Sequence, residues 1–490
     1  MEIFAGIDVG TTSVKGIGVD RYGKILFSYS KELSLQTPRP GWAQQNPEDW
    51  WSAVVEVLKD LCQDKRRLSA VSISGQMHSL VALDEHSKPV YPAILWCDQR
   101  TEKQCKELTE GLGGELSVIN SFGNPILTGF TLPKLLWLKE NEPELFSKIR
   151  KWLLPKDYIV KRLTGRSTID YSDASGTSAL SIGGTFLASA LELCGIKASA
   201  NPELVDSGTI AGYISGEILP ILEGVPVVVG GADNAAAAFG CGVERPGDVM
   251  VSLGTSGTVV AVTKTPVPDP EGRIHLFRHV SPDSFYHMAV ILSATNSLNW
   301  FKDRFASDLH FAEVERLVAA SPAGSIGVIF LPYLNGERTP HRDPNARGTL
   351  VGVSSFHSRG DVLRSIYEGV VFALREGTEL ISDLGTEISS VRIVGGGSRS
   401  KSWCQMIADN LGREVWLPGV DEGAAYGTAR LAASALGFSS DSWITLESKF
   451  SPDLRRKQIY DEVFDIYKDL YRSLKNDFRR LGELQNRIVE

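Results

Sequence analysis

Residues 225–240, VPVVVGGADNAAAAFG, join a β-branched run to a run of small residues. The segment 227–229 has the pattern of a buried strand, and Pro226 is tolerated because it stands at the first strand position. Gly230 and Gly231 break this run, and residues 234–239 read as the opening of a small-residue helix. The stretch therefore predicts a strand, a glycine break and a helix in close succession.

Asp233 and Asn234 are the only strongly polar side chains in this stretch. A carboxylate in such apolar surroundings is costly to bury unless it has partners or a chemical role. Taken alone, the stretch favours Asp233 as a helix N-cap over Asp233 as a catalytic base, because caps are common and bases are rare. The remainder of the chain favours Asp233 as a catalytic base instead.

Length and composition restrict the possible classes of protein. A chain of 490 residues predicts two domains. The net charge of −8 argues against non-specific binding to nucleic acid. Six scattered cysteines without a CxxC pair fit a reducing cytoplasm and exclude a disulfide framework. The N-terminal segment reads as a strand and not as a signal peptide, and no apolar run is long enough to span a membrane.

A strand–turn–strand pattern occurs twice. Strands at 3–9 and 14–19 flank the turn in DVGTTS, residues 8–13, and strands at 250–253 and 258–262 flank the turn in SLGTSG, residues 252–257. The repeat predicts two halves with one topology that face each other across a cleft. Such turns offer backbone N–H groups and hydroxyls to a phosphate. Only the first turn carries a carboxylate, Asp8, suited to a metal's water shell.

Two further apolar segments end in polar clusters. The strand at 71–74 leads into Gly75-Gln76-Met77-His78, and the segment 91–96 leads into Cys97-Asp98-Gln99-Arg100. Polar groups at the ends of apolar segments are a usual lining of a small-ligand pocket. A lone histidine is more often structural, but the neighbouring polar residues favour a binding role for His78.

The second half contains a glycine-rich connection at 395–400, GGGSRS, between a strand at 390–394 and a helix at 401–411. This arrangement suits a nucleotide platform and suits a flexible connection about equally well. It lacks the Walker A lysine and the GxGxxG spacing, so neither a P-loop nor a Rossmann site is predicted.

Two charged segments and the C-terminal tail have less specific patterns. Glu337 and Arg338 read as a solvated surface pair. The polar run 170–177 fits a surface loop or a pocket wall, and the sequence does not decide between them. The tail predicts a helix with Ser451 as its N-cap and Pro452 at its first position, packed on the body through its apolar stripe.

Taken together, these blocks resemble the FGGY carbohydrate kinases of the actin/hexokinase/Hsp70 ATPase superfamily. The resemblance covers nearly the whole chain, and it is carried by GIDVGTT at 6–12, GQMH at 75–78, LPKDY at 154–158, GADNA at 231–235, and LPYL with GERTP within 331–340. It implies an α/β fold with two ribonuclease H-like domains around a central cleft. The expected ranges are 1–243 for the sugar domain, 244–440 for the nucleotide domain, and 441–490 for a helical tail.

The resemblance also implies roles for individual residues. Asp233 would be the general base toward the sugar's terminal hydroxyl, and Asp8 would hold Mg²⁺ through water. The expected sugar-site residues are Gln76, Met77, His78, Asp98, Arg100, Asp233 and Asn234. The expected ATP-site residues are Asp8, Thr11, Thr12, Ser13, Gly254, Thr255, Gly396, Gly397 and Ser400.

Within the family the resemblance is greatest to kinases of D-xylulose, which implies an ATP-dependent, cytoplasmic enzyme that binds a sugar and ATP. Nucleic-acid and membrane partners are not expected, and both a monomer and a homodimer stay open. Many such kinases carry Asn at the position of Cys97 and Gly at that of Ser79. These departures leave L-ribulose, glycerol or gluconate as alternative substrates, and a non-catalytic sugar and ATP sensor as an alternative function.

Overall fold

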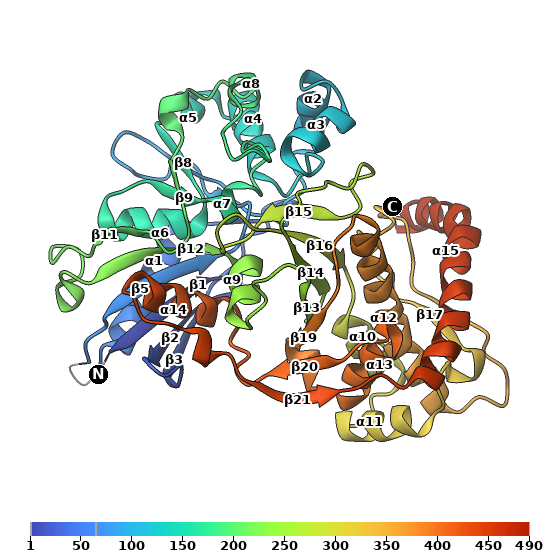
Figure 1. Ribbon diagram of the computed structural model, residues 1–490. Helices are drawn as coiled ribbons and strands as arrows, with labels where there is room; N and C mark the ends of the chain where they lie inside the picture. Colours follow the sequence, from blue (N-terminus) through green and yellow to red (C-terminus); the bar gives the residue numbers. More distant parts are fainter. Residues whose placement is uncertain (1, 64–65, 490) are drawn as a thin grey trace.

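The computed structural model describes residues 2–63 and 66–489, and it contains two large mixed sheets (Figure 1). The first sheet has the strand order β11-β12-β5-β1-β2-β3. Its strands are β1 (Ile3–Val9), β2 (Ser13–Asp20), β3 (Ile25–Glu32), β5 (Ala70–Gly75), β11 (Ile210–Tyr213) and β12 (Pro226–Ala232).

The second sheet has the order β15-β16-β14-β13-β19-β20-β21. Its strands are β13 (Asp248–Leu253), β14 (Gly257–Thr263), β15 (His275–Arg278), β16 (Phe285–Ile291), β19 (Ser390–Val394), β20 (Val415–Pro418) and β21 (Leu446–Phe450). The strand and helix predicted on either side of residues 395–400 therefore form, as β19 and α13 (Lys401–Leu411).

The two sheets share one topology. In the first, β1 is antiparallel to β2 and parallel to β5, which is in turn parallel to β12. In the second, β13 is antiparallel to β14 and parallel to β19, which is parallel to β20. Each sheet ends in an antiparallel edge strand beyond this core, β11 or β21. The predicted repeat of the two hairpins, and with it the two-domain α/β class, is confirmed.

Helices and short ribbons cover the sheets. The helices besides α13 are α1 (Pro47–Leu61), α2 (Glu102–Gly111), α3 (Glu115–Phe122), α4 (Thr131–Asn141), α5 (Pro143–Phe146), α6 (Pro155–Thr164), α7 (Tyr171–Ala174), α8 (Ala188–Leu193), α9 (Asp233–Gly240), α10 (Thr295–Phe305), α11 (Phe311–Ala320), α12 (Arg359–Asp383), α14 (Gly423–Ala435) and α15 (Leu454–Val489). The ribbons pair β4 (Gln44–Gln45) with β7 (Ala93–Ile94), β6 (Val81–Leu83) with β8 (Lys151–Leu153), β9 (Thr168–Asp170) with β10 (Glu203–Val205), and β17 (Ile329–Leu331) with β18 (Thr349–Val351). Helices α2, α3, α4, α5 and α8 gather beyond the first sheet, at the top of the view in Figure 1.

Helix α14 crosses from the second half of the chain to the first sheet, where it lies beside α9, β1 and β5 (Figure 1). Small residues make this approach possible. A Cβ at Gly6 of β1 would lie 1.8 Å from the carbonyl oxygen of Ala425, and a Cβ at Gly427 would lie 1.8 Å from that of Ala236 in α9. The two halves are thus joined by close backbone packing.

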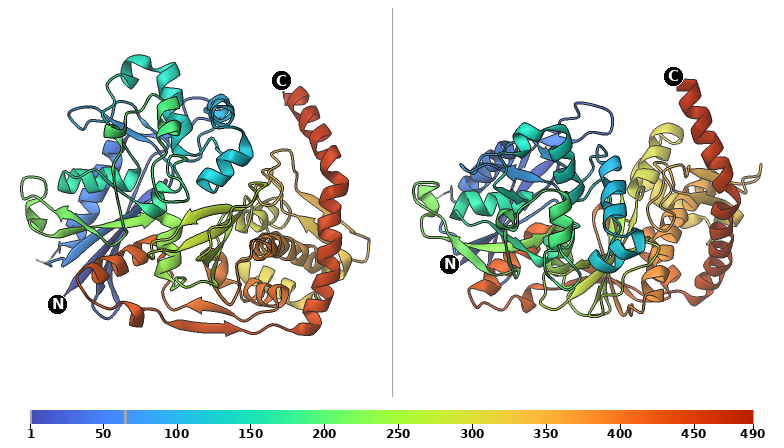
Figure 2. Two further views of the ribbon diagram at one scale, coloured as in Figure 1. Left: turned by 45° about the horizontal axis from the view of Figure 1, so that its top comes forward. Right: turned by 90° about the horizontal axis from the view of Figure 1, so that it is seen from above.

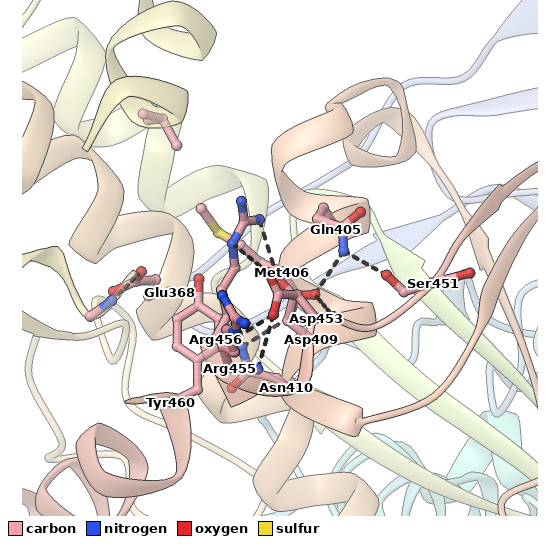
Figure 3. Close-up of polar contacts among 12 residues, drawn as sticks. Glu368, Gln405, Met406, Asp409, Asn410, Ser451, Asp453, Arg455, Arg456 and Tyr460 are labelled. Atoms are coloured by element: carbon pink, nitrogen blue, oxygen red, sulfur yellow. Dashed lines mark hydrogen bonds and ion pairs between the residues drawn. The ribbon is translucent and has the colours of Figure 1, made fainter. Parts of the chain in front are cut away.

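The C-terminal tail is not helical throughout. Strand β21 first extends the second sheet, and α15 then packs along the second half (Figure 2). The helix begins at Leu454, so the prediction of Ser451 as its N-cap is wrong. The Asp453 side chain instead accepts from the backbone N–H of Arg455, at 2.9 Å, because it stands one residue before the first turn. Asp409 of α13 holds this start of the helix, since its Oδ1 accepts from Asp453 N at 2.8 Å (Figure 3).

Among the helices of the described residues, none is both long enough and apolar enough to cross a membrane.

Candidate active site

A cavity of about 650 Å³ lies between the two halves. The first half contributes the ends of β5 and β12, the segment after β7 and residues 127–130, and the second contributes the β13–β14 hairpin, β15, β16 and the loop after β17. The lining residues include Met77, His78, Trp96, Gln99, Phe130, Asp233, Asn234, Ser252, Gly254, Ser256, Phe277, Asn335, Glu337 and Arg338. The predicted cleft is therefore present, with Asp233 on its surface.

Asp233 is the first residue of α9, and Ala232 occupies the N-cap position. The interpretation of Asp233 as an N-cap is therefore wrong. Its Oδ1 instead accepts from the backbone N–H of Asn234 at 2.6 Å and from Asn234 Nδ2 at 2.9 Å. Burial raises the pKa of Asp233 to about 6, and the opposing effect comes from these two hydrogen bonds and not from a cation. No described residue donates a hydrogen bond to the other carboxylate oxygen, and this oxygen together with the raised pKa suits a base.

Met77 and His78 line the cavity beside Asp233. His78 has a φ of 68°, in the left-handed region that non-glycine residues rarely occupy, and its ring stacks on Phe130 at 4.4 Å between centroids. Its Nδ1 lies 2.6 Å from the carbonyl oxygen of Gly176 and must therefore carry the proton. Burial lowers the pKa of His78 to about 3, so the ring is neutral. Nε2 is left as an acceptor for a ligand hydroxyl.

Gln76, Asp98 and Arg100 were predicted at the sugar site, but in the described structure they are not among the residues that line the cavity. Asp98 and Arg100 form a buried ion pair, with 2.7 Å between Oδ2 and Nη2, and the guanidinium lies over Trp42. Gln76 lies beneath the first hairpin turn, where its Nε2 donates to the carbonyl oxygen of Gly10 at 3.3 Å. These three side chains support the wall from behind.

Asp8 stands near the end of β1, directly before the first hairpin turn. Its Oδ1 is buried and has no hydrogen-bond partner among the described residues. Burial, and after it the charge of Asp233, raises the pKa of Asp8 to about 7, while Lys15 opposes the shift. A buried, unpaired carboxylate oxygen of this kind is a fit ligand for the water shell of a divalent cation. The structure contains no cluster of three acidic, histidine or cysteine ligands within the described ranges.

The other predicted ATP-site residues lie around the two hairpins. Thr12 and Thr255 are exposed, Thr11 and Ser13 are half-buried, and Gly254 lines the cavity. Gly396 faces open space, and a Cβ at Gly397 would lie 2.6 Å from Cβ of Leu253 at the end of β13. Ser400 caps α13 by accepting from Trp403 N, and its hydroxyl donates to Glu315 at 2.5 Å. The glycine connection therefore packs against the second hairpin.

The prediction that Glu337 and Arg338 form a solvated surface pair is wrong. Glu337 is only 2% exposed, and its Oε1 accepts from the backbone N–H groups of Leu292 and Arg338. Burial raises the pKa of Glu337 to about 8 and lowers that of Arg338, which lines the cavity. The polar run 170–177, for which the sequence left two alternatives open, contributes no residue to the cavity between the halves, and its Asp170 and Asp173 are buried around Lys156.

Sequence reasoning missed several lining residues, namely Trp96, Gln99, Phe130, Ser252, Ser256, Phe277, Asn335 and Arg338. Trp96 and Gln99 stood within a segment that had been singled out, and Ser252 was noted as the counterpart of Asp8. Phe130 and Phe277 carry no local signal, because a buried aromatic residue has the same pattern in a core and in a cavity wall.

Comparisons with known proteins identify the architecture. The model of the N-terminal domain of the FGGY family of carbohydrate kinases matches residues 3–240, and that of the C-terminal domain matches residues 249–436. The chain belongs to the FGGY family of carbohydrate kinases. The predicted domain limits at residues 243 and 440 stay predictions.

Full-length relatives of this FGGY chain include xylulose kinases. That of Bacillus subtilis (strain 168) is 39% identical over 97% of this chain and 98% of its own. That of Escherichia coli (strain K12) is 36% identical over 96% of this chain and 99% of its own. A crystal structure described as a xyloylose kinase from Brucella ovis superposes with a TM-score of 0.90 at 34% identity, covering 97% of this chain and 99% of that one. The predicted actin/hexokinase-like fold is confirmed.

Proposed function

We propose that this FGGY kinase transfers the γ-phosphoryl group of ATP to the terminal hydroxyl of D-xylulose, giving D-xylulose 5-phosphate. The proposal is supported by full-length relatives named xylulose kinase at 36–39% identity. One observation carries the mechanism. Asp233 lines a cavity that the sugar-side residues Met77 and His78 share with the second hairpin.

Asp233 serves as the general base in this proposal. Its free carboxylate oxygen accepts the proton of the attacking hydroxyl, while Asn234 holds the other oxygen at 2.6 and 2.9 Å. His78 Nε2 accepts a hydrogen bond from a second sugar hydroxyl and so orients the ketose. Since phosphoryl transfer depends on position and charge neutralisation more than on covalent help, such orientation is the main contribution of these residues.

The two hairpin turns bind the phosphates, with the hydroxyls and backbone N–H groups of residues 11–13 and 254–255 as donors. The glycine connection at Gly396 and Gly397 borders the adenosine. Asp8 would hold Mg²⁺, consistent with its buried Oδ1, which has no hydrogen-bond partner among the described residues. When bound, Mg²⁺ neutralises charge on the transferring phosphates.

Release of ADP in a coupled assay tests the proposal, with D-xylulose, L-ribulose, glycerol and gluconate as acceptors. D-Xylulose should give the highest kcat/KM. A higher kcat/KM for another acceptor would show that this acceptor is the preferred substrate, and the protein would still be a carbohydrate kinase. Sugar binding by calorimetry without any turnover would make the protein a sensor and overturn the proposal.

A further inference from the structure

Ser79 has a buried hydroxyl that joins two parts of the active site. The side chain has no exposed surface, and its Oγ donates to Gln76 Oε1 at 3.0 Å. The same oxygen accepts from the backbone N–H of Trp96 at 3.1 Å. Because the buried hydroxyl both donates and accepts a hydrogen bond within the protein, it is not free to bind a sugar directly.

Trp96 and Gln76 are joined a second time, through Thr11. The indole Nε1 of Trp96, whose side chain lines the cavity, donates to Thr11 Oγ1 at 3.0 Å. Thr11 Oγ1 in turn donates to Gln76 Oε1 at 3.4 Å. The hydrogen bonds of Ser79, Trp96, Thr11 and Gln76 thus close a ring, here called the Ser79 ring.

The Ser79 ring connects two surfaces with different proposed ligands. Trp96 is 42% exposed and lines the cavity together with Met77 and His78, which are assigned above to the sugar. Thr11 lies in the first hairpin turn, and the amides of Gln76 and Gln45 hold the turn from behind by donating to the carbonyl oxygens of Gly10, at 3.3 Å, and Thr11, at 2.8 Å. A ligand that fixes the Trp96 indole therefore also fixes the Thr11 hydroxyl.

We propose that Ser79 is a positioning residue that couples sugar binding at Trp96 to phosphate binding at the first hairpin turn. The inference rests on the proposed function, since it takes the sugar and ATP sites as assigned above. Without the Ser79 hydroxyl, the backbone N–H of Trp96 loses its hydrogen bond to Ser79 Oγ, and with it the link to Gln76. Of the hydrogen bonds in the ring, Trp96 then keeps only the one from its indole to Thr11. Both ligands still bind, but each orders less of the other's site.

The test measures coupling by calorimetry on the full chain. The Kd of a non-hydrolysable ATP analogue with Mg²⁺ is determined with and without saturating D-xylulose, and the ratio of the two values is the coupling factor. Ser79→Ala should reduce this factor by about threefold or more, and should change the sugar-free Kd by less than about twofold. Thr11→Val opens the ring at its other side, so the two substitutions should be non-additive in the coupling factor.

Ser365→Ala is the matched control. Ser365 is buried in α12, and its hydroxyl donates to the carbonyl oxygen of Val362 at 2.7 Å, away from the cavity. The Ser365→Ala variant should have a lower Tm than the wild type and the same coupling factor. An unchanged factor in Ser79→Ala, or a wild type that phosphorylates D-xylulose without coupling, overturns this inference and leaves the proposed function intact. A wild type that turns over no acceptor in the panel refutes both.

Discussion

Asp233 lies in an environment that suits a general base but lowers the stability of the folded protein. Among the described residues, Asn234 is the only one that donates to its carboxylate, and burial raises the pKa of Asp233 to about 6, so the folded environment disfavours the charged form. We therefore expect Asp233→Asn to lower kcat by about 10²–10⁴-fold, the usual contribution of a general base. Tm at pH 8 should not fall, because the substitution removes a desolvated charge.

Steady-state kinetics and calorimetric unfolding of the same preparation check both parts of this prediction. Asn141→Ala, which removes a hydrogen bond inside α4 from Nδ2 to the carbonyl oxygen of Trp137 at 2.9 Å, is the control for loss of a single polar contact. Near wild-type activity in Asp233→Asn would exclude Asp233 as the base.

The raised pKa of Asp233 also predicts a pH profile. A base works only when deprotonated, so kcat/KM should be constant above pH 6 and fall by about tenfold per pH unit below it. The profile is measured at saturating Mg²⁺, since the neighbouring Asp8 has a pKa raised to about 7 in the absence of a cation. An acidic limb near pH 4, the ordinary range of an exposed carboxyl, would contradict this prediction.

At the scale of single residues, the sequence predicted the cavity-lining Met77, His78, Asp233 and Asn234, because each stands where a strand ends. By the same reasoning Asp98 was expected at the sugar site, but it is not among the described residues that line the cavity. A polar residue that follows a strand has the same local pattern whether it faces a cavity or pairs with Arg100 behind the wall. Only the tertiary contacts distinguish these two cases, and the spacing of residues in the sequence does not predict tertiary contacts.

Among the elements, α14 has the contacts that join the two halves most closely. Its Gly427 faces the backbone of α9, where a Cβ would lie 1.8 Å from the carbonyl oxygen of Ala236. We expect Gly427→Ala to lower the free energy of unfolding by about 1–3 kcal/mol, because the added methyl group forces the two helices apart. It should also lower kcat, since α9 begins with Asp233.

Chemical denaturation, followed by tryptophan fluorescence, measures this effect. Gly183→Ala is the control, since its added Cβ would meet only Ser181 Oγ, at an ordinary 3.6 Å. Equal free energies of unfolding for the two variants would show that α9 and α14 can move apart without loss of stability.

The hairpins and the helix α14 show which elements can be predicted from sequence. Each hairpin is a local pattern of alternating residues around a turn, so β1–β2 and β13–β14 were found. The packing of α14 on β1 joins residues more than 400 positions apart, as where Gly6 faces the carbonyl oxygen of Ala425. A run of small residues predicts close packing but does not identify the partner.

In the whole molecule, the two halves meet at more than one place. Helix α14 packs against α9, and Asn124, just after α3, bonds to β15. Its Nδ2 donates to the carbonyl oxygen of Leu276 at 2.7 Å, and its Oδ1 accepts from Leu276 N at 3.2 Å. His275, which lines the cavity, lies 2.9 Å from the same Oδ1. Asn124 therefore holds the two halves together at this point.

Asn124→Ala should favour an open molecule, because it leaves two backbone groups of β15 without partners at a cost of about 1–3 kcal/mol. We expect kcat/KM for D-xylulose to fall by about tenfold, with a higher KM, since part of the binding free energy must then close the halves. ATP hydrolysis without sugar should rise relative to transfer, because water is less well excluded. Small-angle scattering should show a larger radius of gyration than the wild type has, and saturating D-xylulose with an ATP analogue should reduce the difference. A radius equal to that of the wild type, together with an unchanged ratio of hydrolysis to transfer, would show that Asn124 plays no part in closing the halves.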